Sequence, residues 1–424
     1  MSNALLDELS WRGLISQSSD IDRLGEHLDE GRTLYCGFDP TADSLHIGSL
    51  VPLLTLRRFQ EMGHRPILVL GGATGLIGDP SFRDDERNLN SADIVGSWVE
   101  SLRRQVEPFL SFEGECSAII ANNLDWTQEM SVISFLRDVG KHFSVNAMIQ
   151  RESVKTRLER ADQGISYTEF SYMLLQGMDY LELARRHDCT LQIGGSDQWG
   201  NIVSGVDLVR RELSKEVFAI TLPLVTKADG TKFGKTAGGA VWIDPRKTSP
   251  YSFYQFWLNA ADADVENYLK LFTFLSQAEV SELLEEMQAA PEKRSAQLRL
   301  AREVTRIVHG QANLESAERI TQAIFGGELA ELTRDDFEQL TLDGLDASSA
   351  ATGDGLLSVM VEAGLAKSVG EARKLVQAGG VRINGEVVTD HQQAIDFGTG
   401  FYGSYLVLRR GKKVHHLLVN SKND

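Results

Sequence analysis

The chain has 424 residues, of which 42% are hydrophobic and 24% charged, and its formal net charge is −17. This length predicts two or three domains, and the composition is typical of a globular protein. No apolar run approaches the ~18 residues of a membrane span, and the first residues lack the basic start and apolar core of a signal peptide. We therefore expect a cytoplasmic protein with no membrane partner.

The acidic charge argues against a protein that coats DNA or RNA, but the charge is uneven. Residues 361–424 carry nine Lys and Arg against six Asp and Glu, so this tail is the part expected to bind a polyanion. The cysteines Cys36, Cys116 and Cys189 stand alone, and the histidines show no metal-ligand spacing. The sequence therefore predicts neither a metal site nor a disulfide framework.

The first half of the chain alternates strands and helices. Residues 1–30 are expected to form an amphipathic helix. Helical spacing runs from Gly48 to Gly63 and again over 168–186. The continuous apolar run 66–70 predicts a short strand, 33–37 is expected to be a buried strand, and 117–121 and 190–193 are two further candidates. Short apolar strands between helices are typical of a parallel α/β sheet, so we expect a Rossmann-like nucleotide-binding domain.

The second half has a different pattern. Residues 249–325 look helical, 341–354 are rich in Gly, Asp, Ser, Ala and Thr, and a helix with short strands follows. The predicted organisation is an α/β domain with a helical insertion, an α-helical domain, a linker and a small α+β domain. The α/β domain is expected over 1–245, with its insertion at about 135–165, and the α-helical domain over 246–340. The linker is expected over 341–354 and the small α+β domain over 355–424.

Two short motifs about 190 residues apart carry most of the functional signal. His46-Ile47-Gly48-Ser49 follows a predicted strand and opens a helix, which offers backbone N–H groups and an imidazole to phosphate. Lys232-Phe233-Gly234-Lys235-Thr236 lies in a Gly-rich loop, whose ammonium groups can close on a pyrophosphate leaving group. Each alone also fits an ordinary helix end or a solvated loop. Together they predict nucleotidyl transfer.

Polar residues gather at the ends of the predicted strands and on one helix face. Asp39 and Thr41 follow the first strand, and the run Gly71–Pro80, with Asp79, follows the second. Tyr172, Gln176 and Asp179 share one helix face, which is either a solvated stripe or a site wall. The segment Gln192–Asn201 joins a strand to a helix through two glycines, and capping explains only part of its polar content.

At these residues the chain resembles the bacterial tyrosyl-tRNA synthetases, a family of class I aminoacyl-tRNA synthetases, over nearly its full length. The tail around Gly370–Asp390 also resembles a small RNA-binding domain of ribosomal proteins. The markers are Tyr35–Thr41, His46-Ile47-Gly48, Gly71–Pro80, Tyr172, Gln176, Asp179, Gly194–Asn201 and Lys232–Thr236. The resemblance implies a tyrosine–tRNA ligase that forms tyrosyl-adenylate from L-tyrosine and ATP and then charges tRNA-Tyr.

The resemblance also implies roles for individual residues. Tyrosine would be bound by Tyr35, Asp79, Tyr172, Gln176, Asp179 and Gln198. ATP would be bound by Gly37, Asp39, Gly48, Ser49, Gly195, Asp197 and Lys235. Catalysis would depend on Thr41, His46, Lys232, Lys235 and Thr236. The tRNA would be bound by Arg210, Arg211, Arg373, Lys374, Arg409, Arg410, Lys412 and Lys413. The insertion would form a homodimer. Mg²⁺ would arrive with ATP, and no cofactor would be permanently bound.

One position departs from the family pattern. Ser49 stands where the class signature has a second histidine, and a hydroxyl can donate there but carries no positive charge. The alternatives are a tryptophanyl-tRNA synthetase, a small-molecule cytidylyl- or adenylyltransferase, and an RNA-binding protein on an inactive synthetase scaffold. Tyr35 with Asp179 favours a phenol over an indole, and the two loop lysines argue against an inactive scaffold.

Overall fold

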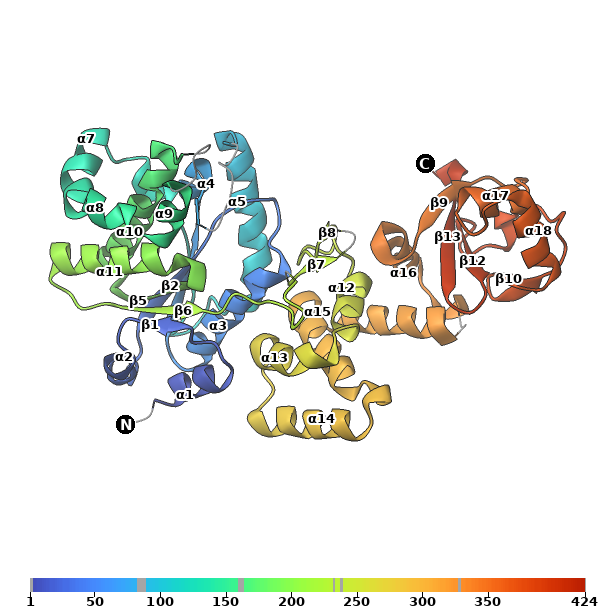
Figure 1. Cartoon of the computed structure of the whole chain (residues 1–424), viewed down its shortest axis with the longest axis horizontal. Coiled ribbons are helices and arrows are strands. Elements are labelled where there is room, and N and C mark those ends of the chain that lie inside the picture. Colours follow the sequence, from blue (N-terminus) through green and yellow to red (C-terminus); the bar gives the residue numbers. More distant parts are fainter. Residues whose placement is uncertain are drawn as a thin grey trace. The chain divides into compact units, whose positions relative to one another are not determined.

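The computed structural model describes residues 3–81, 89–158, 164–231, 233–236, 239–326 and 329–423. The chain divides into two compact units, Met1–Ile243 with Ala263–Glu282 and Asp244–Asp262 with Leu283–Asp424. Figure 1 colours the first unit mainly blue to green and the second mainly yellow to red. Across the described ranges, no helix is long and apolar enough to cross a membrane.

The first unit is built around a six-stranded sheet with the order β1-β6-β5-β2-β3-β4. All pairings are parallel except β1 with β6. The strands are β1 (Gln17–Ser18), β2 (Thr33–Phe38), β3 (Arg65–Leu70), β4 (Ile119–Asn122), β5 (Cys189–Gly195) and β6 (Phe218–Leu222). The parallel order confirms the predicted α/β fold. All four predicted strands are present, and β1 and β6 are additional to them.

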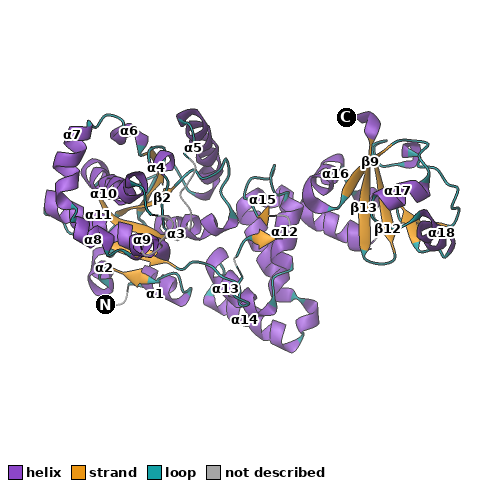
Figure 2. Cartoon of the chain, turned by 45° about the horizontal axis from the view of Figure 1, so that its top comes forward, coloured by secondary structure: helices purple, strands orange, loops and turns teal. Residues whose placement is uncertain are grey.

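Helices connect these strands and cover the sheet, as Figure 2 shows in purple over orange. They are α3 (Leu50–Glu61), α4 (Thr74–Ile77), α5 (Ala92–Val106), α6 (Leu124–Thr127), α10 (Tyr167–His187) and α11 (Trp199–Leu213). Helix α10 begins where the Ser166 side chain accepts a hydrogen bond from the Glu169 backbone N–H. It ends at Asp188, which has a left-handed φ of 51°. These ends agree with the helix predicted over 168–186.

The single helix expected over residues 1–30 is wrong. The segment forms α1 (Ala4–Trp11), strand β1 and α2 (Ile21–His27). Gly13 has a φ of 71°, which ends the first helix, and Asp20 caps the start of the second. Between them, the main chain pairs with the edge of β6. The apolar spacing that suggested one helix therefore serves two short helices on either side of an edge strand.

The predicted insertion at about 135–165 is helical where the structure describes it. It contains α7 (Val132–Ser134), a π-helical turn η3 (Phe135–Val139), a 3₁₀ turn η4 (Gly140–His142), α8 (Val145–Ile149) and α9 (Glu152–Leu158). A small core of Met148, Val154, Met173 and Leu174 joins these helices to α10. The insertion is therefore packed on the helix that carries Tyr172, Gln176 and Asp179.

The predicted α-helical domain over 246–340 is interrupted by a segment that belongs to the first unit. Residues 263–282, which include most of α13 (Asp262–Phe272), belong to the first unit. Two buried arginines explain this assignment. Arg12 donates to the carbonyl oxygens of Lys270, Thr273 and Leu275 at 2.8, 3.0 and 2.7 Å, and Arg58 donates to that of Thr273 at 2.5 Å. Cations at the carbonyl end of a helix stabilise it.

The second unit begins with helices, in agreement with the helical content predicted for 249–325. Helix α12 (Pro250–Leu258) packs on α15 (Ser295–Gly326), and α14 (Gln277–Ala289) precedes α15. Gly310 has a φ of 80° and a ψ of 171°, so α15 consists of two helices joined at this residue. Helix α16 (Arg334–Gln339) follows and is capped by Thr333 and Asp336.

The remainder of the second unit is a five-stranded sheet with the order β11-β10-β12-β13-β9. Its elements are β9 (Ala347–Ala350), α17 (Leu356–Glu362), α18 (Val369–Gln377), β10 (Val381–Ile383), β11 (Glu386–Val388), β12 (Tyr405–Arg410) and β13 (Val414–Asn420). The stretch 341–354, predicted as a linker, differs from a free linker because β9 lies within it and pairs in parallel with β13. Backbone pairing at a sheet edge needs no apolar side chains, which is why its composition misleads.

Candidate active site

One cavity of about 500 Å³ lies at the carboxyl ends of the parallel strands of the first unit. This is where ligands of open α/β sheets bind. Most of the predicted tyrosine- and ATP-binding residues line it, although they come from five separate segments of the chain. They are Tyr35, Gly37, Asp39, Thr41, His46, Gly48, Ser49, Asp79, Tyr172, Gln176, Asp179, Gly195, Asp197 and Gln198.

The carboxylate of Asp179 is buried and held by two donors. Asn123 Nδ2 donates to Asp179 Oδ2 at 3.0 Å, and Trp126 Nε1 donates to Asp179 Oδ1 at 2.8 Å. Burial raises the pKa of Asp179 to about 7, while these two hydrogen bonds lower it. The side chain is only 5% exposed. Helix α10 thus presents a carboxylate of fixed orientation whose charge changes near neutral pH.

Tyr35 presents a phenol to the same cavity. Its ring is 1% exposed and packs edge-on against Tyr180, with ring centroids 5.2 Å apart. Burial raises the pKa of Tyr35 far above its ordinary value, and the negative charge of Asp179 raises it further. Among the described residues, its hydroxyl has no hydrogen-bond partner. A buried hydroxyl without a partner costs free energy, so this wall of the cavity is suited to a polar ligand atom.

Asp39 directly follows β2 and accepts hydrogen bonds from side chains of two other elements. Its Oδ2 accepts a hydrogen bond from the Tyr172 hydroxyl at 2.7 Å, and its Oδ1 accepts one from Thr74 Oγ1 at 2.6 Å. The burial of Tyr172 raises its pKa well above the ordinary value, and the Asp39 charge adds to this. Tyr172 therefore keeps its proton and donates to Asp39. The polar stripe on α10 is a site wall and not a solvated face.

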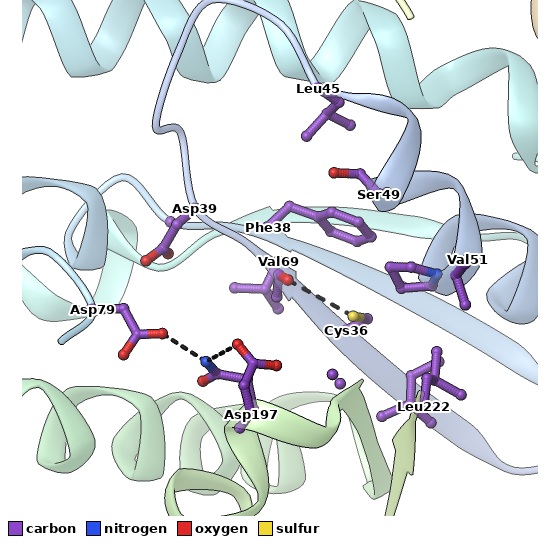
Figure 3. Close-up of a pocket in the computed structure, with 18 of the residues that line it drawn as sticks. Cys36, Phe38, Asp39, Leu45, Ser49, Val51, Val69, Asp79, Asp197 and Leu222 are labelled. Atoms are coloured by element: carbon purple, nitrogen blue, oxygen red, sulfur yellow. Dashed lines mark hydrogen bonds between the residues drawn. The ribbon is translucent and has the colours of Figure 1, made fainter. Parts of the chain in front are cut away.

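Asp79 and Asp197 share one amide. Gln198 Nε2 donates to Asp79 Oδ2 at 2.6 Å and to Asp197 Oδ2 at 3.2 Å, and Gln198 Oε1 accepts from Asn201 Nδ2 at 3.1 Å. In Figure 3, dashed lines run from one amide nitrogen to the carboxylates of Asp79 and Asp197. Burial raises the pKa of Asp197, and the nearby charge of Asp79 adds to it. This part of the cavity is acidic and suits an ammonium group or sugar hydroxyls.

The opposite side of the cavity is apolar. In Figure 3, Val51 and Leu222 lie across the cavity from Asp39 and Asp79. The segment that follows β6 continues this wall with Pro223, Leu224 and Val225. A cavity with one acidic and one apolar side can hold a flat, uncharged ring beside groups that make hydrogen bonds.

The histidine turn lies at the entrance to α3. His46 Nδ1 accepts a hydrogen bond from the Gly48 backbone N–H at 3.0 Å, so the ring proton of the neutral form lies on Nε2. Desolvation by the surrounding protein lowers the pKa of His46, which favours that neutral form. A Cβ at Gly48 would lie 2.7 Å from His46 Cε1 and 2.9 Å from Nδ1. Only glycine leaves the imidazole in this position.

The lysine-bearing loop lies beside this turn. The Gly234 carbonyl accepts from the Val241 N–H at 2.9 Å, and the Val241 carbonyl accepts from the Ile47 N–H at 3.0 Å. Phe233 lines the cavity. Lys235 is exposed on the hairpin of β7 (Lys235–Thr236) and β8 (Gly239–Ala240) and is not among the lining residues. Lys232 and the Thr236 side chain lie outside what the structure describes.

Two family models match the chain. The first is described as tRNA synthetases class I (W and Y) and matches residues 29–326. The second is described as a tyrosine–tRNA ligase SYY-like C-terminal domain and matches residues 336–418. The tyrosine–tRNA ligase of Chromobacterium violaceum is 56% identical over 417 residues, which are 98% of each chain. The chain belongs to the class I tyrosine–tRNA ligase family.

Further relatives agree with this family. The tyrosine–tRNA ligase of Klebsiella pneumoniae (strain 342) is 55% identical and covers 97% of each chain. A solved, C-terminally truncated mitochondrial tyrosyl-tRNA synthetase of Coccidioides posadasii is 32% identical, with a TM-score of 0.66 over 74% of this chain and 91% of that one. A tryptophanyl-tRNA synthetase of Encephalitozoon cuniculi is 13% identical with a TM-score of 0.54, which shows a shared fold alone. The predicted family and enzyme class are confirmed.

Two residues that hold Asp179 lie outside the sequence prediction, namely Asn123, which lines the cavity, and Trp126, which is not among its lining residues. Thr74, which holds Asp39, lies in the predicted run Gly71–Pro80 but had been given no role of its own. One signal was available, because Asn122 and Asn123 directly follow a predicted apolar strand. The apolar wall after β6 was missed because β6 was not predicted, although Phe218–Leu222 is apolar at four of its five positions.

The predicted tRNA-binding residues are not among the residues that line this cavity. Arg210 and Arg211 are exposed on the last turn of α11 and pair with Asp207 at 2.5 and 2.7 Å. In the second unit, Arg373 and Lys374 are exposed on α18, and Lys412 and Lys413 are exposed between β12 and β13. Arg409 and Arg410 are half-buried on β12, where Arg410 Nη1 donates to the Leu365 carbonyl at 2.8 Å.

Proposed function

We propose that the chain activates L-tyrosine with ATP, forms tyrosyl-adenylate and pyrophosphate, and transfers the tyrosine to the 3′ end of tRNA-Tyr. The observation that carries this proposal is the pair of Tyr35 and Asp179 in one cavity wall. One offers a buried hydroxyl without a partner among the described residues, and the other a buried carboxylate. A phenolic hydroxyl can accept from Tyr35 and donate to Asp179. Phenylalanine would leave the Tyr35 hydroxyl without a partner and would give the Asp179 carboxylate no donor beyond Asn123 and Trp126, at a cost in free energy.

Other polar residues of the cavity would bind the ammonium and carboxylate groups of tyrosine. Asp79, Tyr172 and Gln176 would bind the ammonium group, with Gln198 beside the carboxylate. The Gln176 Oε1 atom is buried without a partner in the described chain, which supports its use for a ligand. Gln198 already donates to Asp79, so it links the ammonium site to the site of the reacting carboxylate.

The other half of the cavity would bind ATP. The apolar wall would hold the adenine, and Asp197 with Gly195 the ribose. Gly37, Asp39, Gly48 and Ser49 would line the nucleotide. His46 would donate from Nε2 to phosphate oxygens, with Thr41 beside it. Lys232, Lys235 and Thr236 would act on the pyrophosphate, and Mg²⁺ would enter with ATP as part of the substrate.

The chemistry needs positioning more than proton transfer. The tyrosine carboxylate is already an anion and attacks the α-phosphorus, and the bond to pyrophosphate breaks. Charge accumulates on the leaving group and on the phosphoryl oxygens, where donors and ammonium groups stabilise the transition state. The adenylate would then pass its tyrosyl group to a hydroxyl of the terminal ribose of tRNA, releasing AMP.

We also propose that the protein is a homodimer formed through the insertion. Apolar side chains are exposed on the inserted helices and on the first residue of α10. Val132, Ile133, Val145 and Tyr167 are 73%, 70%, 57% and 70% exposed. Exposed apolar patches of this kind mark protein interfaces. Sedimentation equilibrium of the purified chain tests this part: a monomer at micromolar concentration would contradict it.

For the tRNA, we propose that Arg210 and Arg211 contact the acceptor end. The small C-terminal domain would bind the long variable arm through its exposed basic residues, with Arg409 and Arg410 at the edge. Exposed basic side chains can contact the phosphate groups of a nucleic acid. Because ATP and tRNA are cytoplasmic substrates, the enzyme would work in the cytoplasm.

Tyrosine-dependent exchange between ATP and labelled pyrophosphate tests the proposed function directly. We expect exchange with tyrosine and none with tryptophan. Lys235→Ala should slow the exchange about 10- to 100-fold without a matching loss of tyrosine affinity, because its charge is needed mainly in the transition state. Tight tRNA binding without any exchange would instead support an inactive scaffold and would overturn the proposal.

A further inference from the structure

The lysine-bearing loop has one large apolar side chain over residues 226–240, and this is Phe233. Its ring centroid lies 5.2 Å from that of Phe272 with an angle of 20° between the ring planes. It also lies 5.2 Å from the ring of Tyr268, at 56°. Phe272 and Tyr268 are 0% and 2% exposed. A ring from the loop therefore rests on two rings that are fixed in the core of the first unit.

The support under Phe233 is itself connected to the histidine turn. Phe272 and Tyr268 lie on α13, whose last carbonyl groups are bound by Arg12 and Arg58. Arg58 lies on α3, the helix that begins directly after His46 and Gly48. Helix α13 thus connects the lysine-bearing loop to α3, the helix that follows the histidine turn. The opposite end of α13 holds the loop as well, because Asp264 Oδ1 accepts from the Ala228 N–H at 2.7 Å.

The residue after Phe233 touches the turn directly. Gly234 has a φ of 76°, and a Cβ at this position would lie 3.0 Å from Ile47 Cγ1. Phe233 and Gly234 are thus adjacent residues of the loop that contact α13 and the histidine turn, respectively. The other side chains of residues 226–240 are small, polar or charged, so none can replace this apolar contact.

We propose that Phe233 is a positioning residue for adenylate formation. By stacking on Phe272 and Tyr268 it holds the loop against the histidine turn, so that the Lys235 ammonium group acts on the departing pyrophosphate. This inference rests on the proposed function. It predicts that the ring affects the rate of the chemical step and not the binding of tyrosine, because Phe233 stacks on rings of α13, whereas Tyr35 and Asp179 lie on β2 and α10.

The test is Phe233→Ala, with Phe233→Tyr as the conservative variant. We expect the single-turnover rate of adenylate formation to fall about 10- to 100-fold in the alanine variant, because small displacements of a catalytic group have effects of this size. The dissociation constant of tyrosine should stay within about twofold. Phe233→Tyr should recover most of the rate. Phe112→Ala removes a loop ring that is 39% exposed and lies outside the cavity, and it serves as the matched control.

The outcomes separate the two proposals. If the wild-type chain shows no tyrosine-dependent exchange, the proposed function fails. If exchange is present and Phe233→Ala has the wild-type rate, only this inference fails. Equal losses of rate and tyrosine affinity, or no recovery in Phe233→Tyr, would also overturn it.

A double-mutant cycle gives an independent test. Phe272→Leu should slow adenylate formation, and adding Phe233→Ala to it should slow the reaction little further, since both changes remove one contact. Thermal unfolding of each variant shows whether it is folded, and Tyr268→Leu replaces Phe272→Leu if the latter does not fold. Fully additive losses would overturn the inference.

Discussion

The two ends of the cavity are built in different ways. At the end that we propose for tyrosine, Asp179 and Tyr35 are 5% and 1% exposed, and the Asp179 carboxylate is held by Asn123, which directly follows β4, and by Trp126 on α6. At the end that we propose for the triphosphate, the side chains of His46 and Lys235 are exposed. Under the proposed function, selection of the amino acid is therefore built into the core, whereas the groups for the leaving pyrophosphate are carried by exposed side chains.

This difference predicts a division of labour. Changes at the buried end should alter which amino acid binds and how tightly. Changes at the exposed end should alter the rate of the chemical step, because contacts that strengthen only in the transition state affect the rate and not the ground-state affinity. The three substitutions below test this division, beginning with the largest expected effect.

Asp179→Asn should lower kcat/KM for tyrosine by at least about 100-fold, because a charged hydrogen bond to the phenol is lost and the buried donors of Asn123 and Trp126 face a neutral amide. Discrimination against phenylalanine should shrink as well. Exchange assays with both amino acids measure the two effects. Asp125→Asn, an exposed change on the same short helix as Trp126, is the control. Unaltered discrimination in Asp179→Asn would contradict the assignment.

Gly48→Ala should slow adenylate formation about 10- to 100-fold, because its Cβ would displace the His46 ring by steric overlap. The dissociation constant of tyrosine should stay within about twofold. Stopped-flow measurement of the single turnover reports both. Gly96→Ala on α5, where a Cβ meets nothing within 4 Å, is the matched control. A large loss of tyrosine affinity in Gly48→Ala would show that the two ends are not separate.

Trp126→Phe should have the smallest effect, a shift in pH dependence. Asp179 has its pKa raised to about 7 by burial, so its anion forms, and tyrosine binding tightens, as the pH rises through 7. Removal of the Trp126 hydrogen bond should move this midpoint upward by about one pH unit. Titration of tyrosine affinity between pH 6 and 9 measures the shift, with Trp98→Phe as control. A downward shift would contradict the geometry.

The sequence was informative where functional side chains follow a strand or share one face of a helix. Asp39 directly follows β2, His46 and Asp79 lie in the segments after β2 and β3, and Tyr172 and Asp179 lie on one face of α10. Local patterns were therefore enough to select these residues. Asn123 and Trp126 were missed because their role lies in contacts to Asp179, 56 and 53 residues further along the chain. No local pattern reports such a pairing.

The fold shows the same limit. Strands β2 to β5 were predicted, whereas β6 was missed although four of its five residues are apolar. Strand β1 has only two residues, both polar, and pairs with the sheet edge. The membership of residues 263–282 in the first unit depends on Arg12 and Arg58 binding carbonyl groups more than 200 residues away. Helical periodicity predicted α13 but contained no information on which core it joins.

The most direct test of this account compares Asp179→Asn with Gly48→Ala in one experiment. For both variants, the equilibrium dissociation constant of tyrosine and the single-turnover rate of adenylate formation are measured at saturating ATP. The account predicts that Asp179→Asn loses mainly affinity for tyrosine, and that Gly48→Ala loses mainly rate. If both variants lose affinity and rate in the same proportion, the division between a buried selecting end and an exposed reacting end is contradicted.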